Sequence, residues 1–449
     1  MLRIRLNTVT RWSIAASAFI ALAAWPFVLH ARMAETASAD PIMQLAPAPA
    51  EQDYLTRDKS VAFLESRYKK DPADMITPAR LSAEYLQRYR ERGDIGDVLR
   101  AESAAHASLD VLPARVNAFG DSALASAELT LHKFRAAKAA LLAARHAQGK
   151  GASTDIALAS IDLELGEYGQ ARRLIEANAA QLDPPAAVTA ARWYEISGRL
   201  AESDRLVDRA AHYADSIFDV PAERRAWYHF RLGELRFLGG DNAGAIAQEH
   251  QALELFPNDF LALGALARIE LANKDYAQAQ AAAARGVAIV PTPETLGILA
   301  DTQAAQGDVS AAAASRAEID AEEKIGNVQH VNDRLIAVYL ADHGLRAADA
   351  YAIARRELLV RDDVYAEDTL AWCAAADGRW HEARAAAAKA LRFDTEDPRL
   401  QYHAGVIAQH FGDAVEAVRR YTRALALNPH FSATQADDAR AQLARLQAP

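Results

Sequence analysis

Histidine and carboxylate side chains between His330 and His410 are the residues of this chain best suited to chemistry. The region contains the histidines His330, His343, His381, His403 and His410, and the aspartates Asp362, Asp363 and Asp368. Imidazole nitrogens and carboxylate oxygens bind metal ions and can act as general acids or bases. No two of these histidines are three or four residues apart, so none forms a chelating pair on one helical turn. A metal or catalytic site would have to be assembled from several segments. One hypothesis for the chain is such a site, with His330, His343, His403 and His410 as candidate ligands.

The sequence lacks the motifs of the common enzyme classes. It has no GxxxxGK[ST] phosphate loop, no GxGxxG after a strand, no GxSxG elbow, no HExxH helix and no CxxC pair. Cys373 is the only cysteine, so no intrachain disulfide can form. Its position in an apolar helical pattern predicts a buried core residue rather than a reactive thiol. We therefore predict a protein that is not an enzyme and binds no cofactor.

A period of 34 residues runs through the region that contains these side chains. Between Val364 and Phe431 this spacing separates Gly378 from Gly412, Ala383 from Ala417, Ala390 from Ala424, and Leu391 from Leu425. It also separates Pro257 from Pro291, and Gly344 from Gly378. A fixed period of this length indicates one structural unit that is repeated along the chain.

The repeated unit resembles the tetratricopeptide repeat (TPR). It has a glycine turn between two helical patterns, small residues in the second helix and a closing Asn428-Pro429. The resemblance implies an all-α fold, a right-handed superhelical solenoid of antiparallel helix pairs. About ten such hairpins fit between Ala79 and Phe431. The alanine-rich hydrophobic fraction of 51%, with aromatics at only 7%, also favours closely packed helices.

The chain divides into five segments by composition and pattern. These are a signal peptide or membrane anchor (1–39), a Pro/Ala-rich spacer (40–53), divergent helical repeats (54–225), regular repeats (226–431) and a C-terminal capping helix (432–449). In the last segment, Ala439, Leu443 and Leu446 share one face of a helix that begins near Ala433. That face is expected to cover the last apolar edge of the solenoid.

The first 39 residues predict export. Three arginines precede an apolar run from Trp12 to Leu29, and Ala37-Ser38-Ala39 offers small residues at the spacing that an export peptidase needs. The run is also near the lower limit for spanning a bilayer, so a single uncleaved N-terminal anchor is the alternative. In both cases the arginines place the body outside the cytoplasm. The expected location is exported, either periplasmic or anchored in the inner membrane and facing the periplasm.

The net charge argues against some partners. The whole chain carries −10, and residues 1–39 contribute four arginines and one glutamate, so the remainder carries −13. An acidic body of this kind is not expected to bind nucleic acid or anionic lipid as its main ligand.

The TPR resemblance implies that the first helix of each hairpin lines a concave groove. The register of the repeats selects groove candidates, namely Arg334, Asp342, Tyr365, Asp368, Trp372, Arg399, Tyr402 and His410 in the last units, with Trp227 and Phe230 earlier. Aromatic rings offer contact area at low entropy cost, and arginine pairs with carboxylates, so this surface suits a peptide. The alternative is that the aromatic residues pack against neighbouring repeats. The Lys-x-x-x-Asn pair of carboxylate-clamping TPR modules has no counterpart at the corresponding positions.

The expected function is a non-enzymatic scaffold in the cell envelope that binds a protein or peptide partner on its concave face. Two alternatives stay open. One is a metal-handling or catalytic role for the region from His330 to His410. The other is an assembly factor for envelope complexes, in secretion or in c-type cytochrome maturation.

Overall fold

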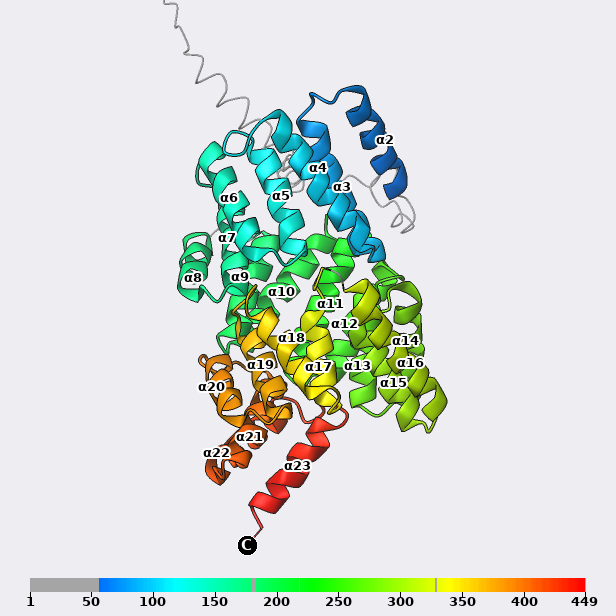
Figure 1. Ribbon diagram of the computed structural model, residues 1–449, viewed down its shortest axis with the longest axis vertical. Helices are drawn as coiled ribbons and strands as arrows, with labels where there is room; N and C mark the ends of the chain where they lie inside the picture. Colours follow the sequence, from blue (N-terminus) through cyan, green and yellow to red (C-terminus); the bar gives the residue numbers. More distant parts are fainter. Residues whose placement is uncertain (1–55, 180–182, 218, 328, 449) are drawn as a thin grey trace, which may run out of the picture. The chain divides into compact units, whose positions relative to one another are not determined.

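The computed structural model describes residues 56–179, 183–217, 219–327 and 329–448. All regular elements in these residues are helices (Figure 1). The segments predicted as signal peptide or anchor (1–39) and as spacer (40–53) lie outside the described residues. Within the described ranges, no helix has both the length and the apolar character needed to cross a bilayer.

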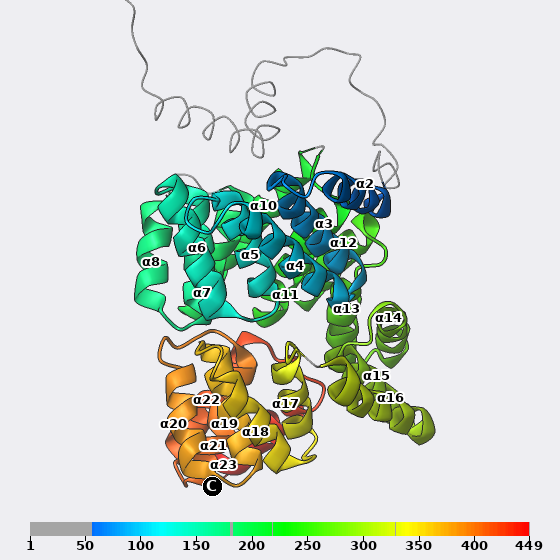
Figure 2. The same cartoon turned by 45° about the horizontal axis from the view of Figure 1, so that its top comes forward.

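Ten antiparallel helix pairs follow one another and can be traced in order in Figures 1 and 2. The pairs are α3 (Ile76–Arg92) with α4 (Ile95–Val111), α5 (Ala118–Thr130) with α6 (Phe134–Gln148), α7 (Ala152–Glu164) with α8 (Tyr168–Ala177), α9 (Pro184–Ile196) with α10 (Leu200–Asp215), α11 (Ala222–Leu238) with α12 (Asn242–Leu255), α13 (Phe260–Ala272) with α14 (Tyr276–Ile289), α15 (Pro293–Ala305) with α16 (Val309–Ala321), α17 (Asp333–Asp342) with α18 (Ala347–Glu357), α19 (Val364–Ala376) with α20 (Trp380–Ala390), and α21 (Pro398–His410) with α22 (Ala414–Leu427). Helix α2 (Arg57–Lys70) precedes them, the π-helix η3 (Glu322–Gly326) follows α16, and α23 (Gln435–Leu446) comes last. The predicted all-α solenoid of about ten hairpins is confirmed.

Aspartate caps determine where many of the second helices begin. The side chains of Asp241, Asp275, Asp308 and Asp413 each accept a hydrogen bond from the backbone N–H of the third residue that follows. Such a cap satisfies one of the four N–H groups that the first turn leaves without a helical partner. These turns, in which a residue of positive φ precedes the aspartate, therefore separate the two helices of a unit and start the second one.

Small residues let the two helices of each hairpin approach closely. Ala245, Ala279, Ala383 and Ala417 in the second helices are all fully buried, as their repeat positions predict. Opposite them, a Cβ added to Gly405 of α21 would lie 2.8 Å from the ring of Tyr421. This distance is well inside van der Waals contact, so the hairpin has no room for larger side chains there.

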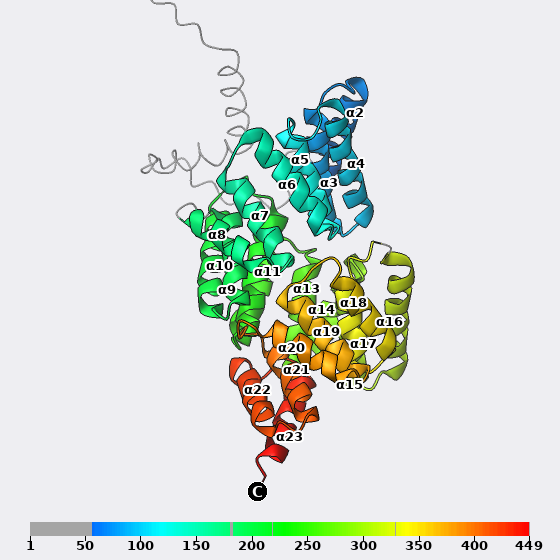
Figure 3. The same ribbon diagram turned by 60° about the vertical axis from the view of Figure 1, so that its left-hand side comes forward.

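Hairpins that are five units apart also touch one another. The turn glycines Gly198 and Gly240 lie so close to the loops after α20 and α22 that an added Cβ would be 2.9 Å from the oxygen of Asp394 and 2.6 Å from that of Leu427. A Cβ on Gly166 would overlap the carbonyl oxygen of Asp362 after α18. In Figure 3 the end of α20 lies beside the α9/α10 pair.

Hydrogen bonds cross the same boundary, which we call the seam. They join Asp362 N to Glu164 O (3.1 Å), Val364 N to the Tyr168 hydroxyl (2.9 Å), the Thr395 hydroxyl to Ile196 O (2.7 Å), and Asn428 Nδ2 to Phe237 O. The last three pairs are 191 to 199 residues apart in sequence. The ring of Phe393 also meets Tyr168 and Trp193 edge-on. Successive turns of the superhelix therefore pack against each other, which the repeat pattern did not predict.

Glu249 of α12 is a buried acid inside one hairpin. Its side chain is fully buried, and neither carboxyl oxygen has a hydrogen-bond partner among the described residues. It faces Gly233 of α11, where the missing Cβ makes room for the carboxyl group. Burial raises the pKa of Glu249 well above its usual value near 4.5, so the folded protein favours the protonated form.

Glu249→Gln should remove a pH dependence of stability. Because the folded-state pKa is raised, the folded protein binds more protons than the unfolded chain between the two pKa values. The free energy of unfolding therefore falls as pH rises above about 4.5. The variant should gain about 1 kcal/mol or more over the wild type at pH 8, and little at about pH 5. Urea unfolding across this pH range would test this, with Glu318→Gln on exposed α16 as control. Parallel curves for wild type and Glu249→Gln would contradict the prediction.

Candidate functional site

Six of the predicted or neighbouring side chains form one connected group on three consecutive first helices. Successive first helices pack on one another, α17 on α19 and α19 on α21. From them come Asp342 (α17), Asp368 and Trp372 (α19), and Arg399, Tyr402 and His403 (α21). We call these six residues the inner cluster. Sequence reasoning had assigned the first five to a groove and His403 to a possible metal site.

The open part of the inner cluster is a tryptophan bonded to an aspartate. Trp372 Nε1 donates a hydrogen bond to Asp342 Oδ1 at 2.7 Å. Asp342 is exposed and Trp372 half-buried, so both can be reached from solvent. The surrounding protein raises the pKa of Asp342 by displacing water, and His403, the Trp372 bond and Arg399 offset part of this rise.

Behind the indole lies a buried histidine-aspartate pair. The imidazole of His403 stacks on Trp372, with ring centroids 4.2 Å apart and planes 10° from parallel. His403 Nδ1 lies 3.0 and 3.1 Å from the two carboxylate oxygens of Asp368. His403 is only 3% exposed, and its Nε2 has no partner in the part of the chain that the structure describes. Because Nδ1 is held by Asp368 and the ring stacks on Trp372, the pair fixes the orientation of the indole.

Arg399 is the cation of the inner cluster. It is half-buried, and no carboxylate of the described residues lies within 4 Å of its guanidinium. Burial would lower its pKa, but the carboxylates of Asp397, Glu294, Asp342 and Asp368 raise it overall. The potential around Arg399 is therefore negative.

Charged side chains of α9, α11 and α13 also contribute to the electrostatic potential around Arg399. Arg268 of α13 pairs with Glu234, and Arg231 and Arg192 pair with Glu195 of α9. Together with the groups around Arg399, the carboxylates are Glu195, Glu234, Glu294, Asp342, Asp368 and Asp397, and the arginines are Arg192, Arg231, Arg268 and Arg399. The carboxylates outnumber the arginines by two.

Tyr365 and Arg334, also selected from the register, lie outside the inner cluster. The hydroxyl of Tyr365 donates to Glu195 of α9 at 2.7 Å, and Arg192 stacks over its ring at 4.4 Å. Tyr365 therefore joins two turns of the superhelix. Arg334 has no carboxylate within 4 Å among the described residues, and burial together with repulsion from Arg361 lowers its pKa.

The remaining groove candidates pack against neighbouring helices. Trp227 packs on the core that includes Ala187 of α9 and Ala210 of α10, and Phe230 packs on the small core around Ala252. His410 is exposed and stacks on Trp380 of α20 at 3.7 Å, on the side of the second helix. Each of these three side chains therefore has contacts within the described solenoid.

The four histidines considered as metal ligands are not brought together. His343 bonds Asp301 (2.9 Å) and the carbonyl of Tyr339, His330 lies 3.3 Å from Asp333, and His403 and His410 have the neighbours described above. Nowhere in the described ranges do three histidine, cysteine or acidic side chains converge as a metal site would require. Cys373 is fully buried, as predicted, and burial raises the pKa of its thiol.

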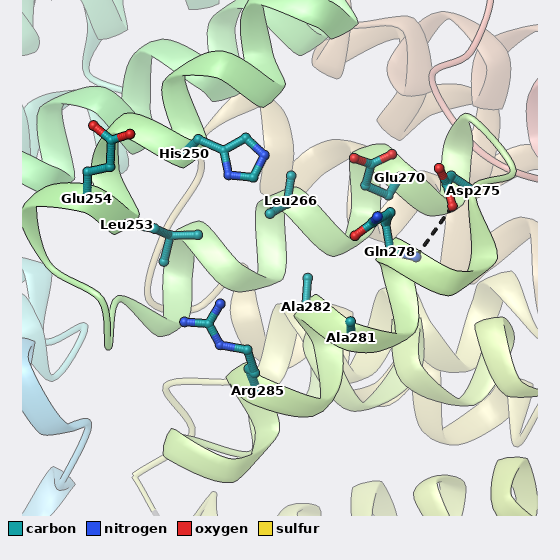
Figure 4. Close-up of a pocket in the computed structure, with 10 residues that line it drawn as sticks. All are labelled: His250, Leu253, Glu254, Leu266, Glu270, Asp275, Gln278, Ala281, Ala282 and Arg285. Atoms are coloured by element: carbon teal, nitrogen blue, oxygen red, sulfur yellow. Dashed lines mark hydrogen bonds between the residues drawn. The ribbon is translucent and has the colours of Figure 1, made fainter.

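An open pocket of about 660 Å³ lies on other helices, between α12, α13 and α14 (Figure 4). His250 and Leu266 point into it, and its polar lining includes Glu254, Glu270 and Arg285. Burial and Asp275 raise the pKa of Glu270, while His250 lowers it. The lining contains both acidic and basic side chains on exposed helix surface, so it does not favour one class of ligand.

Two residues of the site were missed by sequence reasoning. Gln435 Nε2 of α23 donates to Asp342 Oδ1 at 2.8 Å, and the hydroxyl of Tyr402 donates to Asp438 Oδ2 at 2.8 Å. The sequence predicted that α23 would cap the last hairpin, and its apolar face does pack there through Ala436 and Ala439. No pattern indicated that its polar side chains would reach back to α17.

Comparisons with known proteins find similarity at the level of solved structures. No family model matches the chain, and no curated protein does. Similar structures include yeast Tom70 (15% identity, TM-score 0.33, covering 87% of this chain and 92% of that one) and the APC/C hetero-tetramer Cut9-Hcn1 (12%, 0.33, 87% and 93%). A third is a tetratricopeptide repeat protein from Parabacteroides merdae ATCC 43184 (17%, 0.39, 58% and 98%). These values are too low to carry an argument about function. The ten helix pairs of the described residues make the chain an all-α helical-repeat solenoid. The 34-residue period that relates Gly344, Gly378 and Gly412 resembles that of the tetratricopeptide repeat.

Proposed function

We propose that this protein is a non-enzymatic scaffold of the cell envelope that binds a protein or peptide segment over the inner cluster. The observation that carries the proposal is the accessible Trp372–Asp342 pair beside Arg399, whose guanidinium has no close carboxylate among the described residues. An indole, a carboxylate and a guanidinium together offer apolar area, an acceptor and a donor within one small surface. Proteins recognise polypeptide segments with such combinations.

The arrangement of the inner cluster supports binding with little rearrangement. Trp372 is held from behind by the stacked, buried His403, which Asp368 orients. Side chains that are already ordered lose little entropy when a ligand docks on them. The indole is therefore an anchor point that is ready before the partner arrives.

The envelope location rests on the export pattern of residues 1–39, and an N-terminal anchor is its alternative form. Determining whether the mature N-terminus is Asp40 would decide between cleavage and anchoring. A role in assembling envelope complexes is a narrower version of the same proposal. The identity of a captured partner would decide that point.

Trp372→Ala should weaken binding of the partner by about thirtyfold, because the loss of a central aromatic anchor costs about 2 kcal/mol. The partner would be captured from envelope extract with the wild-type protein, and its dissociation constant would then be measured for each variant. Arg399→Gln should also weaken binding. Val415→Ala, an exposed change on α22, is the control and should bind as the wild type does. If both inner-cluster variants kept full affinity with normal unfolding curves, the proposed surface would be wrong.

A further inference from the structure

The start of helix α23 lies on the inner cluster. Gln435 is bonded to Asp342 of α17, and Asp438 accepts a hydrogen bond from Tyr402 of α21. Asp437 forms an ion pair with Lys274 at the end of α13 (2.7 Å), and Ala433 packs on the core of α13 and α15. The segment from Ala433 to Asp438 thus reaches α13, α17 and α21, which belong to three different hairpins. Capping α22 alone would not require these contacts.

The contacts of this segment differ in strength. Ala436 and Ala439 are buried against α21 and α22 and hold the helix in place. The bond from Gln435 to Asp342 joins side chains that solvent reaches, and so does the ion pair of Asp437 with Lys274. Exposed polar contacts contribute little because water competes for both groups. The Gln435 side chain can therefore leave Asp342 while α23 stays docked.

Asp342 accepts a hydrogen bond from a neutral donor, although the negative surroundings favour a positively charged one. Gln435 offers a neutral amide, whereas the carboxylates around the inner cluster outnumber the arginines by two. A lysine or arginine would form a charge-assisted bond to Asp342, which is about twice as strong as a neutral one.

We propose that the partner presents a lysine or arginine side chain that displaces Gln435 from Asp342. This inference rests on the proposed function of the inner cluster and adds the charge of the ligand. It also gives α23 a role, because Gln435 shares Oδ1 of Asp342 with Trp372 and holds that oxygen until a stronger donor arrives. The recognised partner is therefore a segment with a basic residue, flanked by side chains that can pack on Trp372.

The test uses the full chain and fluorescent peptide pools of about twelve residues, long enough to cross three helices. The pools are identical except for a central lysine, norleucine or glutamate, and binding is followed by fluorescence polarisation. We expect the lysine pool to bind about tenfold more tightly than the norleucine pool, which corresponds to about 1.4 kcal/mol. High salt should reduce this preference.

Three variants separate the parts of the inference. Asp342→Asn should bring the lysine pool to the level of the norleucine pool. Gln435→Ala should tighten binding of the lysine pool about threefold, since the competing amide is gone. Gln435→Lys places a tethered cation on Asp342 and should weaken the lysine pool about tenfold or more. Glu318→Gln removes an exposed acid on α16 and should change nothing.

The outcomes distinguish this inference from the proposed function. If all pools bind equally and Trp372→Ala abolishes binding, the inner cluster binds peptides but the basic residue is wrong. A preference for the glutamate pool would make Arg399 the recognition group and would also overturn the inference. If no pool binds to the wild type or to Gln435→Ala, the peptide-binding function itself is contradicted.

Discussion

Gly166→Ala should destabilise the protein far more than Gly307→Ala, although both glycines sit in the same kind of turn. Their φ angles are +70° and +86°, so an L side chain costs about 1 kcal/mol of backbone strain at each. At Gly166 the new methyl group would also overlap the carbonyl oxygen of Asp362 across the seam, and backbone cannot move aside cheaply. At Gly307 nothing lies within 4 Å. The difference should be about 1–3 kcal/mol, the usual cost of overpacking.

Urea unfolding followed by circular dichroism would measure this difference. A second readout is hydrogen exchange of α18 and α19, whose connecting loop carries Asp362. Exchange there should become faster in Gly166→Ala, even though the mutation lies in the α7/α8 turn. Equal free energies of unfolding for the two variants would show that the seam does not stabilise the fold.

Ala417→Trp should disrupt the C-terminal hairpin. Ala417 is 0% exposed and belongs to the core that joins α21, α22 and α23 through Tyr402, Tyr421 and Ala439. An indole has no space there, because Gly405 already lies against the ring of Tyr421. We expect a loss of about 3 kcal/mol or more and early unfolding of α21 to α23.

Val415→Trp is the matched control for this prediction. Val415 lies two residues away on the same helix and is 83% exposed, so the same indole is placed in solvent. Its unfolding curve should match that of the wild type within about 0.5 kcal/mol. An unchanged melting profile for Ala417→Trp would contradict the register of the last repeat.

The local part of the fold was predictable because it depends on neighbouring residues. The 34-residue spacing that aligns Gly378 with Gly412 marks where each hairpin turns. The alanines aligned with Ala417 mark where the two helices of a hairpin lie close together. Both features recur because every unit meets the next in the same way. Helix number, the buried positions and the capping face of α23 follow from this regularity.

The seam was not predictable, because it depends on the rotation that accumulates over five hairpins. Thr395 and Asn428 have no special pattern in the sequence, yet their side chains bond to Ile196 and Phe237. The same limit explains the mixed result for the site. The register selected Trp372 and Asp342, which do lie together, but it also selected Tyr365, whose hydroxyl is taken by Glu195 on the preceding turn.

The seam also restricts the gain or loss of repeat units in the evolution of this protein. In an open array each unit touches only its neighbours, so duplication or deletion of one unit leaves the other interfaces intact. Here Gly166, Gly198 and Gly240 each fit one particular loop five hairpins away. Gaining or losing a single 34-residue unit between α12 and α18 would place all three turns opposite the wrong loops at once. The number of repeats in the middle of the chain is therefore tied to the geometry of one superhelical turn.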